Sequence, residues 1–388
     1  MKPMHDESGN AHYITTKIGE DGQGLLYQTK NEGIILRDAT GKDHDRLRYD
    51  DVKLLPVSEI KELILPGLYL RKPNVGYLMT VPADFVPLTR IIATDEDTAA
   101  FYKKTGGLKR RLSLLVEISR VLHKLHSLPC MYGGMSADRV FVSKDSDNND
   151  ARLLYSVKMT GFMPLAEEND TDPYIAGEAR RGQGDIQSDA FAFGSLAYDL
   201  LTMKDTHSLP DGMGEVVKLL DRAKSAEAAN RPKIIELFRA FLSQLDVLLT
   251  CQNCKYDFYY TANACPACKS KPPKMLRATI YDQVNQTRIN RGFKIFEFST
   301  NAQSFWCRHT DMVLLGDDAK SRIDCMVSLS GDKKLFFVLK NQMEKEISVN
   351  NKPLAPGQAT AVPLPAKSIR ISFDIYSSTR RYIDMVMA

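Results

Sequence analysis

The chain has 388 residues and a formal net charge of +4, which is small for this length and favours no particular polyanionic partner. Its 43% hydrophobic and 26% charged residues are typical of a folded globular protein, and a chain this long predicts two or three domains. The sequence has no run approaching about 18 apolar residues and no apolar N-terminal core, so we expect neither a membrane span nor a secretory signal.

Residues 11–249 change from strand-like to helical patterning along the chain. Residues 13–37 predict two strands around a glycine-rich turn and then a third strand, and residues 75–81 predict another. Helical patterns follow, and in residues 188–202 apolar side chains recur at helical spacing, with Asp189 as a candidate N-cap. This order indicates a short β part followed by a longer helical part.

The stretch MYGGMSADRVFV (residues 131–142) follows an amphipathic helical pattern at residues 111–129 and ends in a strand-like triplet. A helix, a short loop and a strand in this order resemble the catalytic loop of protein kinases. VGYLMTVPADFVPL, before it, resembles the strand that leads to the kinase hinge, and DPYIAGEAR, after it, resembles the segment ending in Ala-Pro-Glu. Residues 11–249 therefore resemble a protein kinase domain, and look most like the bacterial kinase-like proteins that carry a zinc ribbon after the catalytic region. The resemblance implies a bilobal fold.

The turn GEDGQGLLY resembles the glycine-rich loop whose backbone covers ATP phosphates, and it supplies Gly19, Gly22 and Gly24. Asp21 stands where the motif has its second glycine, and a carboxylate there would repel a triphosphate. Arg37 stands at the position of the phosphate-binding lysine and presents a planar fork in place of a compact ammonium. An ordinary strand-end arginine is an equally good interpretation. These residues indicate a vestigial nucleotide site and argue against binding of ATP and magnesium.

Three catalytic positions of the resembled family are filled by other residues. Gly134 stands for the aspartate base, Arg139 for the magnesium-binding asparagine and Gly161 for the aspartate of Asp-Phe-Gly. Glycine can neither accept a hydroxyl proton nor offer a side-chain oxygen to magnesium. Asp138 lies nearby, but moving it into the base position would shift the following strand out of register. Loss of even one electrostatic donor typically costs about 100- to 1000-fold in rate, so we expect no phosphoryl transfer.

Three positions that support the fold in the same family are retained, namely Glu178, Asp189 and Arg231. The resemblance implies a buried ion pair between Glu178 and Arg231 and a bond from Asp189 to the backbone of the catalytic loop. A buried carboxylate without its partner would cost several kcal/mol, by about the magnitude known for broken buried pairs, so selection for the fold keeps these residues. Losses confined to the catalytic groups therefore predict a pseudokinase.

Residues 250–270 contain two Cys-x2-Cys pairs ten residues apart: Cys251, Cys254, Cys265 and Cys268. Two such turns can complete a tetrahedral shell of four thiolates, which suits a structural zinc ion in a small ribbon. The alternatives are a redox pair, buried thiols, or iron in rubredoxin-like geometry. The odd total of seven cysteines and the missing signal peptide favour a reducing, cytoplasmic compartment.

Residues 276–388 read as short β-branched or aromatic-rich strands separated by turns, which predicts an all-β sandwich. The stretch from KLFFVLK to SIRIS resembles a forkhead-associated (FHA) domain, a family that binds phosphothreonine. Asn350 and Asn351 fit that resemblance, but Asp317 stands where its arginine is expected, and Ser321 with Arg322 does not fit its spacing. We expect an FHA-like sandwich and do not predict phosphopeptide binding.

The chain is thus expected to be a multidomain α+β protein. The leading hypothesis is that it is not an enzyme but an inactive pseudokinase that serves as a protein-binding scaffold or allosteric regulator in a phosphorylation-linked pathway. The resemblance implies protein partners such as an active kinase, a PP2C-type phosphatase or a von Willebrand-type domain protein. The alternative is a divergent kinase or nucleotidyl transferase that uses Arg37, Asp138 and Asp172 in a rearranged pocket.

Nucleic-acid binding by the ribbon is a third possibility, and it requires a basic ribbon surface. Lys255, Lys269, Lys271 and Lys274 give it modest support, because linker lysines are commonly just solvated. Nucleic acid is therefore not an expected partner from the sequence.

Overall fold

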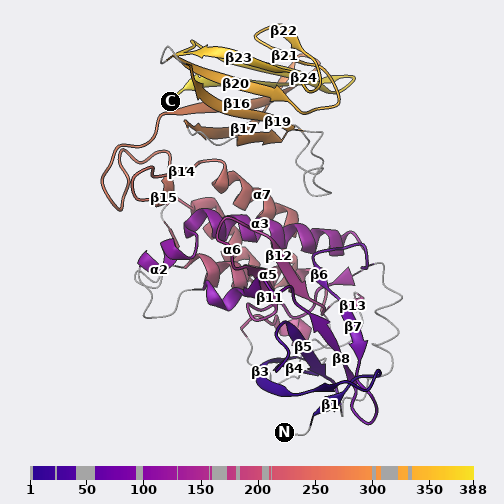
Figure 1. Ribbon diagram of the computed structural model, residues 1–388. Coiled ribbons are helices and arrows are strands. Elements are labelled where there is room, and N and C mark those ends of the chain that lie inside the picture. The colour runs from indigo at the N-terminus through magenta and orange to yellow at the C-terminus, as the bar shows by residue number, and fades with distance from the viewer. Residues whose placement is uncertain are drawn as a thin grey trace. The chain divides into compact units, whose positions relative to one another are not determined.

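The computed structural model describes residues 3–21, 24–40, 57–92, 99–128, 130–156, 158–159, 173–180, 184–202, 209–210, 212–298, 303–306, 322–330 and 334–388 (Figure 1). The chain divides into two compact units, Met1–Leu242 and Ser243–Ala388. Both helices and strands are present, with strands in the majority of elements. Across the described ranges, every helix is too short or too polar to cross a lipid bilayer.

The first unit begins with a five-stranded antiparallel sheet in the order β3-β4-β5-β8-β7. Its strands are β3 (Ile14–Asp21), β4 (Gly24–Thr29), β5 (Ile34–Asp38), β7 (Pro66–Tyr69) and β8 (Gly76–Thr80). Leu36, Leu70 and Leu78 pack together as one buried cluster. A small hairpin of β1 (Met4–His5) and β2 (Ala11–His12) joins the sheet through a bridge from Asp6 to Leu70.

A smaller four-stranded sheet follows in the order β6-β12-β11-β9. Its strands are β6 (Leu63–Ile64), β9 (Phe85–Pro87), β11 (Val140–Ser143) and β12 (Ala151–Leu154). All four residues of β11 are buried, which fits its continuous apolar run. Next to it, β10 (Cys130–Met131) pairs with β13 (Lys158–Met159). The loop between β10 and β11 is the segment that resembles the kinase catalytic loop.

Helices make up most of the rest of this unit: α2 (Ala99–Lys104), α3 (Gly107–His126), α4 (Gly177–Arg180), α5 (Ile186–Leu201), α6 (Gly214–Ala223) and α7 (Ile234–Leu245), with 3₁₀ turns at Leu88–Arg90 and Ala228–Asn230. The expectation that Asp189 caps α5 is wrong. Asp185 is the N-cap, because its carboxylate accepts the backbone N–H groups of Gln187 and Ser188 in a capping box. Asp189 lies within the first turn of the helix, and its side chain accepts hydrogen bonds from the loop between β10 and β11 instead.

The second unit contains the hairpin of β14 (Leu248–Thr250) and β15 (Asp257–Tyr259) and two larger antiparallel sheets. One sheet has the order β17-β16-β25-β24-β21-β22 and the other the order β18-β19-β20-β23. Their strands are β16 (Met275–Val284), β17 (Thr287–Glu297), β18 (Gln303–Trp306), β19 (Arg322–Leu329), β20 (Leu335–Asn341), β21 (Ile347–Val349), β22 (Lys352–Leu354), β23 (Ala359–Leu364), β24 (Ile369–Tyr376) and β25 (Thr379–Met387). One buried cluster takes members from both sheets, including Phe337, Ile371 and Met385, so the two sheets pack face to face.

The cysteine-bearing hairpin packs on the same body as the sandwich. Leu249 and Phe258 of the hairpin share a buried cluster with Met275 of β16 and Ile295 of β17. The backbone N–H of Ile295 donates to the carbonyl of Asp246 at 2.7 Å. The ribbon and the sandwich therefore belong to one compact unit, although a proline-containing segment joins them in the sequence.

Candidate functional site

The four cysteines of residues 250–270 lie on two turns of matching conformation. In the first turn the N–H of Lys255 donates to the carbonyl of Cys251 at 2.8 Å, and in the second the N–H of Lys269 donates to that of Cys265 at 2.9 Å. Lys255 and Lys269 both have φ of 60°, the left-handed region. Each turn thereby doubles back and aims its pair of thiols at the other pair.

The four sulfur atoms form one compact cluster, with all Sγ atoms within 4.8 Å of one another. The Sγ atoms of Cys251 and Cys268 are 3.6 Å apart, as are those of Cys254 and Cys265. Zn–S bonds of about 2.3 Å in tetrahedral geometry give sulfur–sulfur edges of about 3.8 Å, whereas a disulfide requires about 2.05 Å. The thiols are free, and their spacing fits a tetrahedrally bound metal ion such as zinc. Tetrahedral iron would fit the same shell.

A serine hydroxyl supports two of these thiols. Ser270 Oγ lies 3.1 Å from Cys251 Sγ and 3.0 Å from Cys268 Sγ. Hydrogen bonds from the side chain and backbone of Ser270 lower the pKa of Cys268 to about 5. Burial acts in the opposite direction on Cys254 and raises its pKa to about 12. Cys268 is therefore ready to bind as a thiolate, while at Cys254 the incoming cation must displace a proton.

Asp189 organises the loop that resembles the kinase catalytic loop. Its side chain is 1% exposed and accepts the backbone N–H of Tyr132 at 2.7 Å and that of Gly133 at 2.9 Å. His126 Nε2, at the end of α3, lies 2.9 Å from the same carboxylate. The buried carboxylate of Asp189 thus holds the end of α3 and the loop that follows it, which lie 56 to 63 residues earlier in the sequence.

Gly134 and Arg139, two of the positions predicted to have lost catalytic groups, are in direct contact. Arg139 is 2% exposed, and its Nη1 donates to the carbonyl of Gly134. Gly134 has φ of +101°, and a Cβ atom there would lie 2.6 Å from Arg139 Nη1. The guanidinium therefore fills the space that a side chain at position 134 would need.

The next contact joins this loop to the glycine-rich hairpin. A Cβ atom on Gly19 would lie 2.5 Å from Asp138 Oδ2, so the carboxylate of Asp138 lies directly against the backbone of β3. Gly24, with φ of +133°, closes the hairpin where a Cβ atom would come 2.3 Å from the carbonyl oxygen of Asp38. Gly22, Gly161 and Asp172 lie outside the described residues.

Arg37 points inward from β5 and is fully buried. Its Nη2 lies 3.5 Å from the carbonyl oxygen of Tyr155, and its guanidinium lies 5.7 Å from the ring centre of Tyr77. Tyr77 and Tyr155 themselves meet edge to face at 6.4 Å. Arg37 therefore reaches the chain just after β12, where Ser156 Oγ donates to the carbonyl of Gly133 at 2.7 Å.

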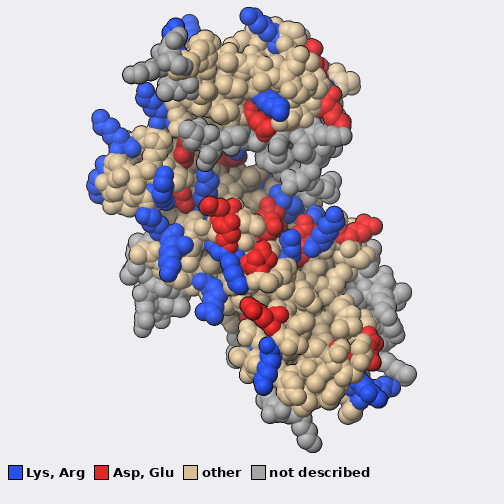
Figure 2. Space-filling model, viewed as in Figure 1, with Lys and Arg blue, Asp and Glu red and all other residues tan. Residues whose placement is uncertain are grey.

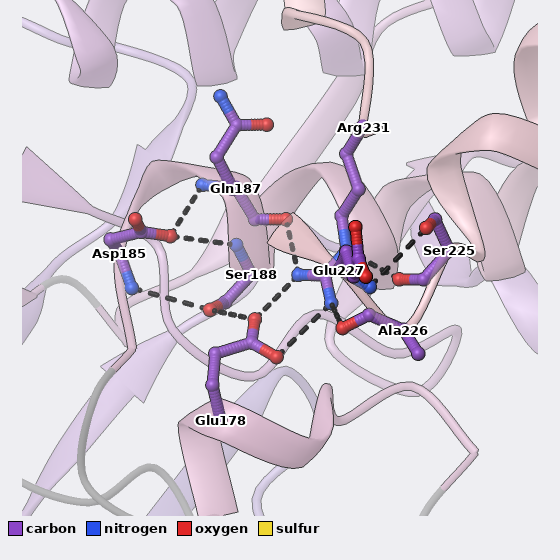
Figure 3. Close-up of polar contacts among 8 residues, drawn as sticks. All are labelled: Glu178, Asp185, Gln187, Ser188, Ser225, Ala226, Glu227 and Arg231. Carbon is purple, nitrogen blue, oxygen red and sulfur yellow. Dashed lines mark hydrogen bonds and ion pairs between the residues drawn. The ribbon is translucent and has the colours of Figure 1, made fainter. Parts of the chain in front are cut away.

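Glu178 and Arg231 form a bidentate ion pair, with Nη1–Oε1 at 2.5 Å and Nη2–Oε2 at 3.0 Å (Figure 3). Ser188 Oγ donates to the same carboxylate at 3.0 Å. Burial raises the pKa of Glu178, but hydrogen bonds from Arg231, the backbone and Ser188 outweigh it and hold the pKa below its usual value. The pair ties α4 to the segment before α7.

No family model matches this chain, and no curated protein matches it. The contacts of Ser270, and those of Asp138 with Gly19, were not predicted from the sequence. The position of Ser270, two residues after Cys268, is a local signal that could have suggested its contact with the thiols. No local signal in the sequence indicates the contact between Asp138 and Gly19.

Proposed function

We propose that the first unit is a protein kinase-like domain that has lost phosphoryl transfer, and that the chain works by binding other proteins. Three features support the fold part of this proposal: the five-stranded antiparallel sheet ahead of a helical region, the bonds from Asp189 to the loop backbone, and the ion pair between Glu178 and Arg231. These are the contacts that the kinase resemblance implies for residues retained to support the fold.

The contact between Gly134 and Arg139 carries the proposal of inactivity. A kinase needs a carboxylate at the first position and an amide that holds magnesium at the second. Here an arginine guanidinium takes up the space of the missing carboxylate and bonds to the backbone beneath it. The two replacements therefore fit each other sterically, and reversing Gly134 alone would not restore a base.

Two further contacts argue against nucleotide binding. Arg37 is turned toward the backbone of Tyr155 and stays fully buried, and Asp138 lies against Gly19 of the glycine-rich hairpin. Both side chains lie where the kinase resemblance would place the triphosphate and the glycine-rich loop that covers it. These two contacts support the proposal that the first unit does not bind a nucleotide.

The other parts of the chain fit the role of a binding protein. A structural zinc ion in the ribbon would fix the fold of residues 250–270, and the two-sheet architecture of residues 276–388 supports an FHA-like sandwich. The role is that of a scaffold or allosteric regulator in a phosphorylation-linked pathway, with an active kinase, a PP2C-type phosphatase or a von Willebrand-type domain protein as the partners that the resemblance suggests.

A double-mutant cycle tests the contact between position 134 and Arg139, and assays with ATP test the loss of phosphoryl transfer. Gly134→Ala should destabilise the full chain more in the wild-type background than in an Arg139→Ala background, with a coupling free energy of about 1–3 kcal/mol. The backbone strain at position 134 is present in both backgrounds, whereas the clash with the Arg139 guanidinium is present only in the wild-type background. Wild-type protein should show no thermal shift with ATP and Mg²⁺ and should transfer no label from γ-labelled ATP. A magnesium-dependent shift together with label transfer would establish the rival enzyme instead.

The binding role is tested separately by capture from native extract with the full-length chain as bait. Recovery of a kinase, a phosphatase or a von Willebrand-type protein in stoichiometric amount supports the scaffold. Recovery of metabolic enzymes or of nothing, together with an inert cleft, would contradict it.

A further inference from the structure

The ribbon and the adjoining strands carry an excess of positive charge, because acidic side chains are sparse in this stretch. Residues 243–298 contain eight Lys and Arg against four Asp and Glu. Within this described stretch, six basic side chains are exposed and form no ion pair: Lys255, Lys269, Lys271, Lys274, Arg277 and Arg288. In Figure 2, blue side chains gather over the part of the molecule that carries β14 and β15 in Figure 1. We call these six residues the basic face.

The acidic side chains of the same stretch are engaged elsewhere and leave this charge unneutralised. Asp246 pairs with Lys294 at 3.1 Å, and Asp282 is buried between Arg381 and Arg291 at 2.7 Å from each. The carboxylates of Asp257 and Glu297 both accept hydrogen bonds from Thr250. The rest of the chain is neutral, with 44 Lys and Arg against 44 Asp and Glu, so this stretch carries the whole net charge of +4.

Aromatic rings lie beneath the two arginines of the basic face. The guanidinium of Arg288 lies 3.5 Å from the ring centre of Tyr281, and that of Arg277 lies 4.2 Å from the ring centre of Phe293. Tyr281 in turn stacks on Tyr382, with ring centres 5.1 Å apart and an angle of 11° between the ring planes. A guanidinium so close to a ring is held in place and presents a cationic group on which a base can stack.

The strand register places these groups on one side of the six-stranded sheet. Arg277 and Tyr281 alternate along β16 with Leu276 and Ala278, which face the core, and Phe293 pairs opposite Thr279 on the same outer side. Phe293 also meets Tyr260 of the ribbon edge to face, with ring centres 5.5 Å apart, so the ribbon adjoins this outer side of the sheet.

We propose that the basic face binds single-stranded nucleic acid. The lysines of the ribbon would neutralise phosphates, and the ring-backed arginines would stack on bases that are free of a partner strand. The described parts of this unit beyond α7 are strands and loops, which offer a broad surface for unstacked bases and no helix for a major groove. This inference stands independently of the proposed loss of phosphoryl transfer, since every residue in it lies in the second unit.

Fluorescence anisotropy of a labelled 20-nucleotide single strand of mixed sequence, with the metal-loaded full-length chain, tests the proposal. Affinity should fall steeply from about 50 to 200 mM salt, with a log–log slope of about −0.7 for each phosphate that is neutralised. Lys271→Gln combined with Lys274→Gln should make this slope shallower by about 1.4. Lys340→Gln combined with Lys352→Gln changes exposed lysines on β20 and on β22, the edge strand opposite β17, and should leave slope and affinity unchanged.

Arginine variants separate stacking from charge. Arg288→Lys keeps the charge and loses the planar group, so affinity should fall about fivefold or more with the salt slope unchanged. No binding at 50 mM salt, equal loss in the Lys340/Lys352 control, or tighter binding to a blunt duplex of the same length would overturn the proposal. Binding to phosphatidylserine vesicles without binding to the oligonucleotide would do the same.

Discussion

Glu178→Gln is a sharp test of the contact that holds α4 in place. The substitution keeps the shape of the side chain and removes its charge, while the Arg231 side chain remains 1% exposed. Arg231 keeps its bonds to the carbonyl groups of Gln187, Ser225 and Ala226. Removing one partner of a buried pair typically costs about 3–5 kcal/mol. Because three carbonyl acceptors remain, we expect the lower end, about 3 kcal/mol of unfolding free energy at pH 7.

The same pair predicts a pH dependence with a definite sign. The folded pKa of Glu178 lies below its usual value, so its contribution to stability is complete above the unfolded pKa of about 4.3. That contribution is lost as pH falls from there through the folded pKa, where the carboxylate takes up its proton. The stability difference between wild type and Glu178→Gln should therefore shrink as pH falls below about 4.

Glu227→Gln is the matched control, since it makes the same chemical change on an exposed carboxylate in the same neighbourhood (Figure 3). The Glu227 side chain accepts a hydrogen bond from Asn230 at 3.1 Å, and its loss should cost no more than about 0.5 kcal/mol. The assay is urea unfolding read by hydrogen exchange in peptides of α5, which reports on this unit alone. A cost below about 1 kcal/mol for Glu178→Gln, or a cost equal to the control, would refute the reasoning.

Three further outcomes are expected. Asp189→Asn puts an amide group where two backbone N–H groups need an acceptor, and it should cost about 3 kcal/mol and speed exchange of those two amides; unchanged exchange would contradict this. Cys251→Ser should reduce the metal content measured by mass spectrometry and speed exchange in β17 as well as in the ribbon, whereas full metal content would exclude the four-thiol site. Lys255→Gly and Lys269→Gly should each stabilise the metal-loaded chain by about 1 kcal/mol in urea unfolding, because φ of 60° strains a residue with a side chain; a loss of stability would show that the lysine side chains contribute more.

Sequence reasoning found the features whose signal is local or carried by a motif. The four cysteines are close because each pair spans one tight turn, and the spacing of such turns can be read directly from the chain. Resemblance to kinase motifs led to the expectation that Glu178 would pair with Arg231, and the two residues are in contact. The N-cap of α5 was misplaced to Asp189, because Asp185 lies before the apolar repeat that signalled the helix.

The remaining features depend on contacts between distant segments, which composition and spacing do not encode. Nothing in the loop sequence indicated that Arg139 would turn back onto Gly134, or that Asp138 would lie against Gly19. The exposure of the basic face could not be read from the sequence for a related reason. Whether Lys271 and Arg277 are neutralised depends on where distant carboxylates point, and that is a property of the folded unit.

The positive charge of Arg139 adds to the missing ligands as support for the proposal that the first unit does not bind magnesium. The Arg139 guanidinium lies against Gly134, where the kinase resemblance would place a carboxylate, so a divalent ion bound there would meet its positive charge. At an assumed separation of about 6 Å and an effective dielectric constant of about 20, a single positive charge opposes a divalent ion by about 5.5 kcal/mol. A lost ligand can be replaced by water, but this repulsion remains for any ion held close to the Arg139 guanidinium. Restoring a carboxylate at position 134 would therefore not suffice to recover metal binding while Arg139 remains, which is why the two positions have to be changed together.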